Sequence, residues 1–156
     1  MASLSSNLPF SIRAFDNLGV GGMYITVEGI EDPVRLLPQD PPFVNRQMLV
    51  PGENGGTYYI LPDYDSQYPP PRMGPKVEEP PKPDYPVLFG EHSLFHITPA
   101  DHTGVPNTYH IRVDTHLVSV QFLVDHNKDT RRAFVQPFPI DIPVEELPVW
   151  EMKPQN

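Results

Sequence analysis

The chain has 156 residues, a formal net charge of −9, 22 prolines and no cysteine. This length suits one domain with a real hydrophobic core, and the lack of cysteine excludes disulfides, thiolate catalysis and zinc sites that use sulfur. The negative charge disfavours nucleic acid as a partner, and no apolar stretch is long enough to span a membrane.

The N-terminal sequence MASLSSNLPF has no basic stretch followed by an apolar run. A secretory signal needs both features, so we expect a cytoplasmic protein. The sequence does not predict an oligomeric state.

Short stretches rich in Val, Ile, Thr, Tyr and Phe follow one another along the chain, and Pro or Gly interrupts nearly every window long enough for a helix. This composition is typical of strands. The predicted strands are Phe10–Ala14, Tyr24–Val27, Met48–Val50, Thr57–Ile60, Leu94–Ile97, Tyr109–Val113, Leu117–Val124, Ala133–Val135 and Val149–Met152. Asn54-Gly55-Gly56 also predicts a tight hairpin turn.

An aromatic-x-Ile pattern opens each third of the chain, at Ile12, Ile60 and Ile111, and each third closes on a large apolar residue. The closing residues are Leu49, Phe95 and Trp150. A threefold repeat in an all-β chain predicts a β-trefoil, with twelve strands in three pseudo-repeats and the repeated apolar residues in its core. We expect one domain over residues 1–156, with approximate repeats 8–50, 57–98 and 108–153.

Patterns that could indicate an enzyme are weak. His92 and His96 are four residues apart in HSLFH, but the stretch lacks the Glu of a zinc-protease helix and is more typical of a strand. Asp101-His102 could join a serine in a hydrolase triad, but no Gly-x-Ser-x-Gly motif positions a nucleophile. We therefore expect no enzyme, no metal and no cofactor.

Several fragments in order resemble a known family. They are GVGGMYITVEG from Gly19, Asp32-Pro33-Val34, Pro41-Pro42-Phe43, Arg46-Gln47, Pro99-Ala100-Asp101-His102, Gly104 and Tyr109-His110-Ile111. Their order and spacing resemble the mycocypins, which are fungal β-trefoil inhibitors of papain-like cysteine proteases. The resemblance runs from about Phe10 to Trp150, so we expect papain-like cysteine proteases as partners.

The resemblance implies that two loops jointly fill the protease cleft. Gly19, Val20, Gly21 and Gly22 match the glycine-containing loop between the first two strands. The second loop runs from Pro38 to Phe43 and includes Asp40, Pro41 and Pro42. Taken without the resemblance, the glycines indicate only a turn, because no Lys-Ser/Thr follows to make a phosphate loop, and the prolines indicate only a stiff connector.

A third loop, DYDSQYPPP from Asp63, matches the mycocypin loop that presents an asparagine to legumain or, in some members, a basic residue to trypsin. Here the place of the asparagine falls near Ser66 or Gln67, and the loop contains no Asn. Arg72 lies beyond three prolines. We expect weak or no inhibition of legumain, with Ser66, Gln67 and Arg72 as a possible second protease loop.

Two other functions stay open. A β-trefoil can be a lectin, since fold does not determine function, and Asp101-His102 and Asp125-His126-Asn127 could be fragments of a sugar site. The Gln-x-Trp signature of ricin-type lectins is absent. The chain could also inhibit serine or aspartic proteases through another loop. Whether it defends the organism or regulates its own proteases is not predicted.

Overall fold

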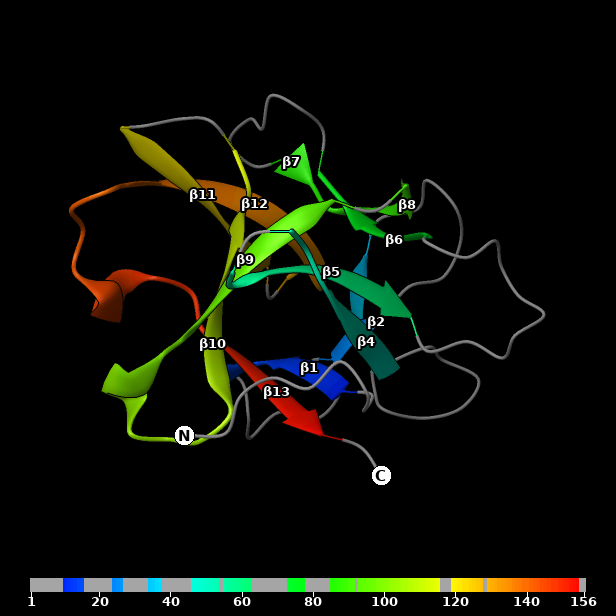
Figure 1. The fold of residues 1–156 in the computed structure, drawn as a ribbon, viewed down its shortest axis with the longest axis horizontal. Helices are drawn as coiled ribbons and strands as arrows, with labels where there is room; N and C mark the ends of the chain where they lie inside the picture. Colours follow the sequence, from blue (N-terminus) through cyan, green and yellow to red (C-terminus); the bar gives the residue numbers. More distant parts are fainter. Residues whose placement is uncertain are drawn as a thin grey trace.

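The computed structural model describes residues 10–15, 24–26, 34–37, 46–53, 55–62, 73–77, 85–91, 93–115, 119–127 and 129–154. In this part of the chain the regular structure is almost entirely β (Figure 1). The strands are β1 (Phe10–Ala14), β2 (Tyr24–Thr26), β3 (Arg35–Leu37), β4 (Arg46–Pro51), β5 (Thr57–Pro62), β6 (Met73–Lys76), β7 (Tyr85–Pro86), β8 (Leu88–Glu91), β9 (Leu94–Pro99), β10 (Thr108–Val113), β11 (Val120–Asn127), β12 (Arg132–Pro139) and β13 (Trp150–Pro154). The described helices are the 3-10 turns η2 (Asp101–Thr103) and η3 (Val144–Glu146), neither of which is long enough to cross a membrane.

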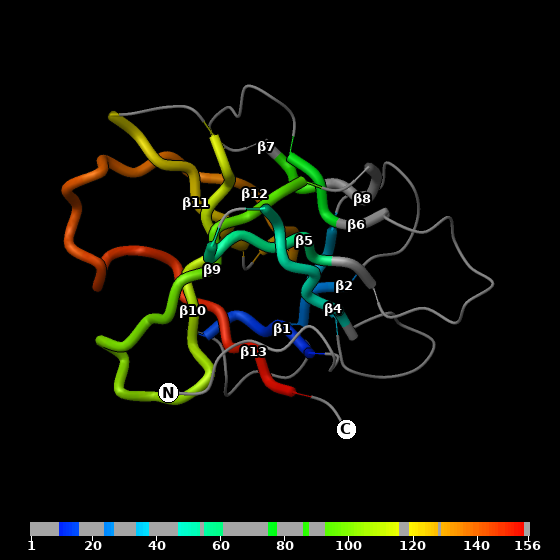
Figure 2. The backbone as a smooth tube through the Cα atoms, in the orientation of Figure 1, coloured from blue at the N-terminus to red at the C-terminus, as the bar shows by residue number. Residues whose placement is uncertain are grey.

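Six antiparallel strands form a closed ring. β1 pairs with β4, β4 with β5, β5 with β9, β9 with β10, β10 with β13, and β13 returns to β1. Figure 2 shows β1, β13 and β10 side by side although β13 is the last strand of the chain. Because a closed ring has no free edge, every strand of the barrel finds partners on both sides.

Three antiparallel pairs lie outside the ring, one from each third of the chain: β2–β3, β6–β8 and β11–β12. Three backbone hydrogen bonds join segments from the three thirds in a cycle. Val34 N donates to Val87 O at 2.8 Å, Val87 N to Ala133 O at 3.1 Å, and Ala133 N to Val34 O at 2.9 Å. The all-β prediction is confirmed, and this threefold arrangement is compatible with the predicted β-trefoil.

The described residues form thirteen strands, one more than the twelve predicted. The difference arises between Tyr85 and Glu91, where β7 pairs with β12 and the adjoining β8 pairs with β6. Pro75 in β6 and Pro86 in β7 hid these strands from sequence reasoning. Proline is tolerated there because each of the two strands pairs on one side only.

The core contains the apolar residues that the repeat singled out. Ile12, Ile60 and Ile111 are at most 2% exposed, and the same holds for the residues that close the thirds, Leu49, Phe95 and Trp150. All six belong to one buried cluster. Each such side chain contributes about 1.5–3 kcal/mol to the stability of the fold on burial. The burial of all six residues in one cluster confirms the predicted core. The boundaries of the domain and its repeats stay predictions.

The turn between β4 and β5 follows the glycine signal. Gly52 N donates to Thr57 O at 2.9 Å, closing the hairpin. Gly56 has a φ of +80°, a region that suits glycine because it has no Cβ atom. The hairpin predicted from Asn54-Gly55-Gly56 is confirmed by the β4–β5 pairing.

Candidate functional site

The protease-binding residues predicted from the sequence lie outside the described residues. They are Gly19, Val20, Gly21 and Gly22 in the first loop, Asp40, Pro41, Pro42 and Phe43 in the second, and Ser66, Gln67 and Arg72 in the third. The structure describes the strands that flank these segments.

The segment 16–23 joins β1 to β2, and the described residues on both sides of it are held by contacts with other elements. At the start, Phe15 N donates to Val149 O at 3.1 Å. At the end, Tyr24 is the register partner of Arg13. The Arg13 guanidinium lies 5.4 Å from the centre of the Tyr24 ring and donates from Nη2 to Glu151 Oε1 at 2.8 Å. This network positions the residue at which the first segment rejoins the sheet.

The residue that precedes the second segment, 38–45, adjoins the residue that follows the first. Tyr24 and Leu37 are register partners in the β2–β3 pair, so residue 24, which follows the first segment, adjoins residue 37, which precedes the second. The two strands are held against the core by Ile25 and Leu36, which are 3% and 0% exposed. The residue after the first segment and the residue before the second are therefore neighbours in one strand pair that is anchored in the core.

β1 also holds the far end of the second segment. Ser11 pairs with Arg46, the residue that follows 38–45, and Phe10 pairs with Gln47. Gln47 in turn pairs with Pro62, where the third segment, 63–72, begins. Pairings among β1 to β5 thus bring together the described flanks of the first two segments and the residue that precedes the third.

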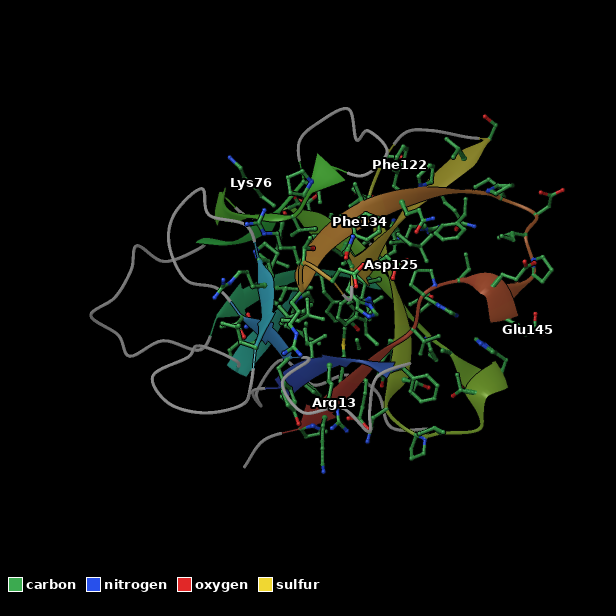
Figure 3. All side chains as sticks on the ribbon, turned by 180° about the vertical axis from the view of Figure 1, so that it is seen from behind. Arg13, Lys76, Phe122, Asp125, Phe134 and Glu145 are labelled. Atoms are coloured by element: carbon green, nitrogen blue, oxygen red, sulfur yellow. The ribbon has the colours of Figure 1, made fainter. Side chains whose placement is uncertain are left out.

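A second feature is a pocket of about 580 Å³ between the β11–β12 hairpin and the chain around η3, which Phe15 and Val149 also line. Figure 3 shows Asp125 on the hairpin and Glu145 on the outer η3 segment. Asp125 and His126 line this pocket together with His102. The structure therefore joins the two His-containing fragments that sequence reasoning singled out separately. That reasoning missed Phe15, Gln136 and Phe138, which also line it.

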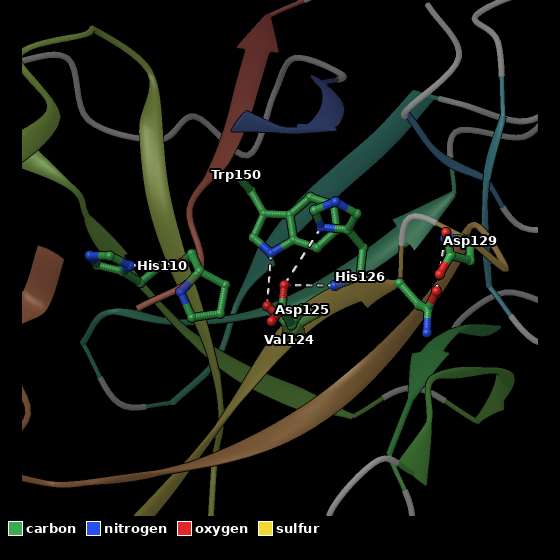
Figure 4. A network of polar contacts seen from close by, with 8 residues as sticks. His110, Val124, Asp125, His126, Asp129 and Trp150 are labelled. Carbon is green, nitrogen blue, oxygen red and sulfur yellow. Dashed lines mark hydrogen bonds and ion pairs between the residues drawn. The ribbon is translucent and has the colours of Figure 1, made fainter. Parts of the chain in front are cut away.

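The wall of this pocket is held by hydrogen bonds to the core, shown in Figure 4. Trp150 Nε1 donates to Val124 O at 2.9 Å, and the His126 ring meets the Trp150 ring edge-on with centroids 5.7 Å apart. His126 N donates to Asp125 Oδ1 at 2.8 Å. These contacts orient the Asp125 carboxylate, whose side chain is 25% exposed.

Two imidazole rings stack beside the same pocket. His102 and His110 lie parallel, with centroids 5.4 Å apart. His110 is buried, and its Nδ1 lies 2.9 Å from Pro148 O, which ties β10 to the segment before β13. Burial lowers the pKa of His110; the contact with the Pro148 carbonyl opposes this, and nearby His102 adds to the lowering. Burial likewise raises the pKa of Tyr109, with Tyr58 and Asp101 adding to the effect.

The remaining histidine hypotheses can be compared with the geometry. His96 lies in strand β9, as predicted for HSLFH, and its Nε2 is 2.7 Å from Asp114 Oδ1. His92 lies outside the described residues. Within the described ranges no three His, Asp or Glu side chains gather closely enough to hold a metal ion.

Comparison with known proteins identifies the family. A family model described as "Peptidase inhibitor clitocypin" matches residues 10–152. Clitocypin-2 of Clitocybe nebularis is 29% identical over 154 residues, which cover 96% of this chain and 97% of that protein. Clitocypin of the same fungus is 28% identical over 132 residues, covering 85% and 84% of the two chains.

The match takes in nearly the whole described β structure, including the strands that flank the three predicted loops. The resemblance inferred from the sequence fragments is thereby confirmed, as is the expectation that the chain is not an enzyme. The chain belongs to the clitocypin family of peptidase inhibitors, the mycocypins.

Proposed function

We propose that this protein inhibits papain-like cysteine proteases by filling the active-site cleft with two adjacent loops. The loops are 16–23, through Gly19–Gly22, and 38–45, through Asp40–Phe43. The family supports the inhibitor class. The observation that carries the proposal is the register pair Tyr24–Leu37, which supports the two loops from one point of the β2–β3 pair.

The mechanism is steric. Gly21 and Gly22 have no Cβ atoms, so their main chain can enter a narrow cleft closely. Pro41 and Pro42 restrict the second loop before binding, and less conformational entropy is then lost on docking. No covalent bond with the catalytic cysteine is needed, because the loops exclude substrate. An interface of about 1,600 Å² in total is sufficient for stable inhibition.

The support beneath the loops suits this role. Loops that fill a protease cleft inhibit only if they are not displaced from it. The residues that flank these loops are joined to β13 through the Arg13–Glu151 ion pair at 2.8 Å, and to the core through Leu36. Rigid support limits the ordering cost of association. The loops therefore supply the binding energy, and the strands β1 to β4 hold the loops in position before binding.

The third loop, 63–72, is proposed to contribute little to legumain binding. Ser66 and Gln67 occupy the place where the family presents asparagine. A protease that cleaves after Asn needs the carboxamide of that residue at its proper distance from the main chain, which serine lacks and glutamine places one methylene farther out. We expect papain to be inhibited and legumain to be affected weakly or not at all.

The decisive experiment titrates the purified protein into papain and follows hydrolysis of a fluorogenic peptide, with legumain and trypsin in parallel. A Gly22→Trp variant should lose roughly 30-fold or more in affinity, the effect of disrupting an interface hot spot. The matched control is Gly55→Trp. Gly55 lies in the exposed β4–β5 turn, and a Cβ atom there meets nothing within 4 Å.

We expect Gly55→Trp to inhibit papain as the parent does. If Gly22→Trp also inhibited as the parent does, the proposed loop would be the wrong site. If the parent failed to inhibit papain but inhibited trypsin or an aspartic protease, the inhibitor would use another loop and another target class.

A further inference from the structure

The pocket beside η3 has walls from regions of the chain that are far apart. Phe15 follows β1, His102 lies in η2, Asp125 and His126 lie in β11, and Gln136 and Phe138 lie in β12. Its volume of about 580 Å³ is within the range of about 300–1,000 Å³ common for small-molecule sites. The inhibitory mechanism above makes no use of it.

The hairpin gives this pocket a fixed wall. β11 and β12 pair over eight residues, with Leu123 opposite Gln136 and Gln121 opposite Phe138. Gln136 and Phe138 are two residues apart on one strand and so project to the same face. An amide and an aromatic ring are thereby presented side by side. Asp125 joins them from the neighbouring strand, oriented by the His126 N–H at 2.8 Å.

The side chains combine hydrogen-bond donors, acceptors and flat apolar surfaces. The Asp125 carboxylate accepts, the Gln136 amide both donates and accepts, and imidazoles can do either. Phe15 and Phe138 add aromatic rings. A hydroxyl group both donates and accepts, and a sugar ring presents hydroxyls at its edge and C–H groups on its faces. We propose that this pocket binds a small neutral saccharide.

The alternative ligand suggested by charge is an organic cation, because Glu145 and Glu146 also line the pocket. Both residues are exposed at its outer wall, where solvent and salt screen their charges. A cation needs only acceptors, whereas the inner wall at Asp125 and Gln136 presents an amide donor as well as acceptors. The inner wall therefore favours a neutral polyhydroxyl ligand, and the cation becomes an alternative outcome of the test.

The chain contains a built-in reporter. Its only tryptophan, Trp150, is buried and contacts His126 and Val124, which adjoin the pocket-lining Asp125. Occupation of the pocket should alter the emission of Trp150. Saturation-transfer NMR on the added sugar provides a second readout that does not depend on the tryptophan.

The test adds glucose, galactose, mannose, N-acetylglucosamine, lactose and chitobiose separately to the full chain. We expect at least one sugar to give a saturable signal by both methods. Asp125→Asn should weaken its binding about tenfold or more, because a charge-assisted hydrogen bond is lost. The fold should persist, since the Asn carbonyl can still accept from His126 N. Gln136→Ala should also weaken binding.

The matched control is Asp129→Asn in the exposed turn between β11 and β12, outside the pocket lining. It should bind the sugar as the parent does, and all three variants should retain papain inhibition at the parent level. The proposal is overturned if no sugar binds, if Asp125→Asn and Gln136→Ala both bind as tightly as the parent, or if N-acetylarginine amide binds and the sugars do not. Failure of papain inhibition alone would not affect it.

Discussion

The β2–β3 pair and the β11–β12 hairpin occupy corresponding places outside the barrel, but they are built differently. β2 and β3 have three residues each and three register pairs. β11 and β12 have eight residues each and eight register pairs. With three register pairs, the short pair depends mainly on buried side chains for its position, whereas the long hairpin is also held by its eight register pairs.

This difference in length suits the β2–β3 pair and the β11–β12 hairpin to different roles. Ile25, Thr26 and Leu36 are at most 3% exposed, so half of the six side chains of the short pair are buried against the core. Under the proposed function, the segments on either side of it bind the protease. The long hairpin has residues to spare, and it places Asp125, Gln136 and Phe138 along a pocket while its ladder stays intact.

The largest effect should come from removing one buried leucine in each region. Leu36 in β3 is 0% exposed and Leu123 in β11 is 1% exposed. Leu36→Ala and Leu123→Ala should each lower the free energy of unfolding by about 2–5 kcal/mol, because each leaves a cavity. Urea denaturation measures the loss. Only Leu36→Ala should also weaken papain inhibition, since it lies beside the Tyr24–Leu37 pair.

The comparison would break if Leu123→Ala weakened inhibition as much as Leu36→Ala at equal loss of stability. Inhibition would then follow overall stability, and the short pair would have no special role in holding the loops.

A smaller effect should come from the ion pair that braces the short pair. Arg13 and Glu151 are partly exposed, with side-chain exposures of 22% and 16%, so the bridge should contribute about 1 kcal/mol or less to stability. Arg13→Ala, Glu151→Gln and the double variant form a mutant cycle for urea denaturation and papain inhibition. We expect the two sites to couple, because Arg13 Nη2 donates to Glu151 Oε1 at 2.8 Å. If the effects of the two single substitutions added strictly in both measurements, the Arg13–Glu151 ion pair would be unimportant for stability and for inhibition.

The smallest effect should be a pH dependence on the side of the long hairpin. Burial lowers the pKa of His110 below its ordinary value of 6.5. As pH falls below 6.5, the unfolded chain takes up a proton that folded His110 does not, so stability decreases. The loss continues down to the pKa of the folded protein and is absent above pH 6.5. Urea denaturation at several pH values measures it.

His110→Gln should remove this component of the slope. His102→Gln should reduce it, because His102 contributes to the lowered pKa. If the free energy of unfolding of the parent changed between pH 7 and pH 5 by the same amount as that of His110→Gln, the assignment of this slope to His110 would be contradicted.

Local patterns predicted most of the secondary structure for a simple reason. Alternation in Phe10–Ala14 and Tyr109–Val113 is a property of a few adjacent residues, and these became β1 and β10. β7 was not predicted, because it pairs with β12 from a distant part of the chain. Pro86 masks β7 further, since only its one-sided pairing makes a proline acceptable.

Of the two candidate sites, the protease loops could be inferred from the sequence and the pocket beside η3 could not. The residues of the protease loops were inferred from ordered fragments of sequence, and the family match supports the class of function but not the individual roles. The pocket could not be inferred as a whole. Phe15 and Gln136 carry no shared sequence signal, and only the return of the chain to the barrel brings them to one cavity.

By itself the sequence determined that the chain is all-β, that the aliphatic and aromatic residues of three repeats are buried, and that the protein belongs to an inhibitor family. The first two follow from residue type and short-range periodicity, whereas the family follows from the order and spacing of fragments that resemble its members. Only the tertiary structure decided which strands close the ring, how Val34, Val87 and Ala133 join the three repeats, and which polar side chains meet beside η3. The physical reason is that pairing between distant strands depends on backbone geometry summed over the whole chain, which no local pattern contains.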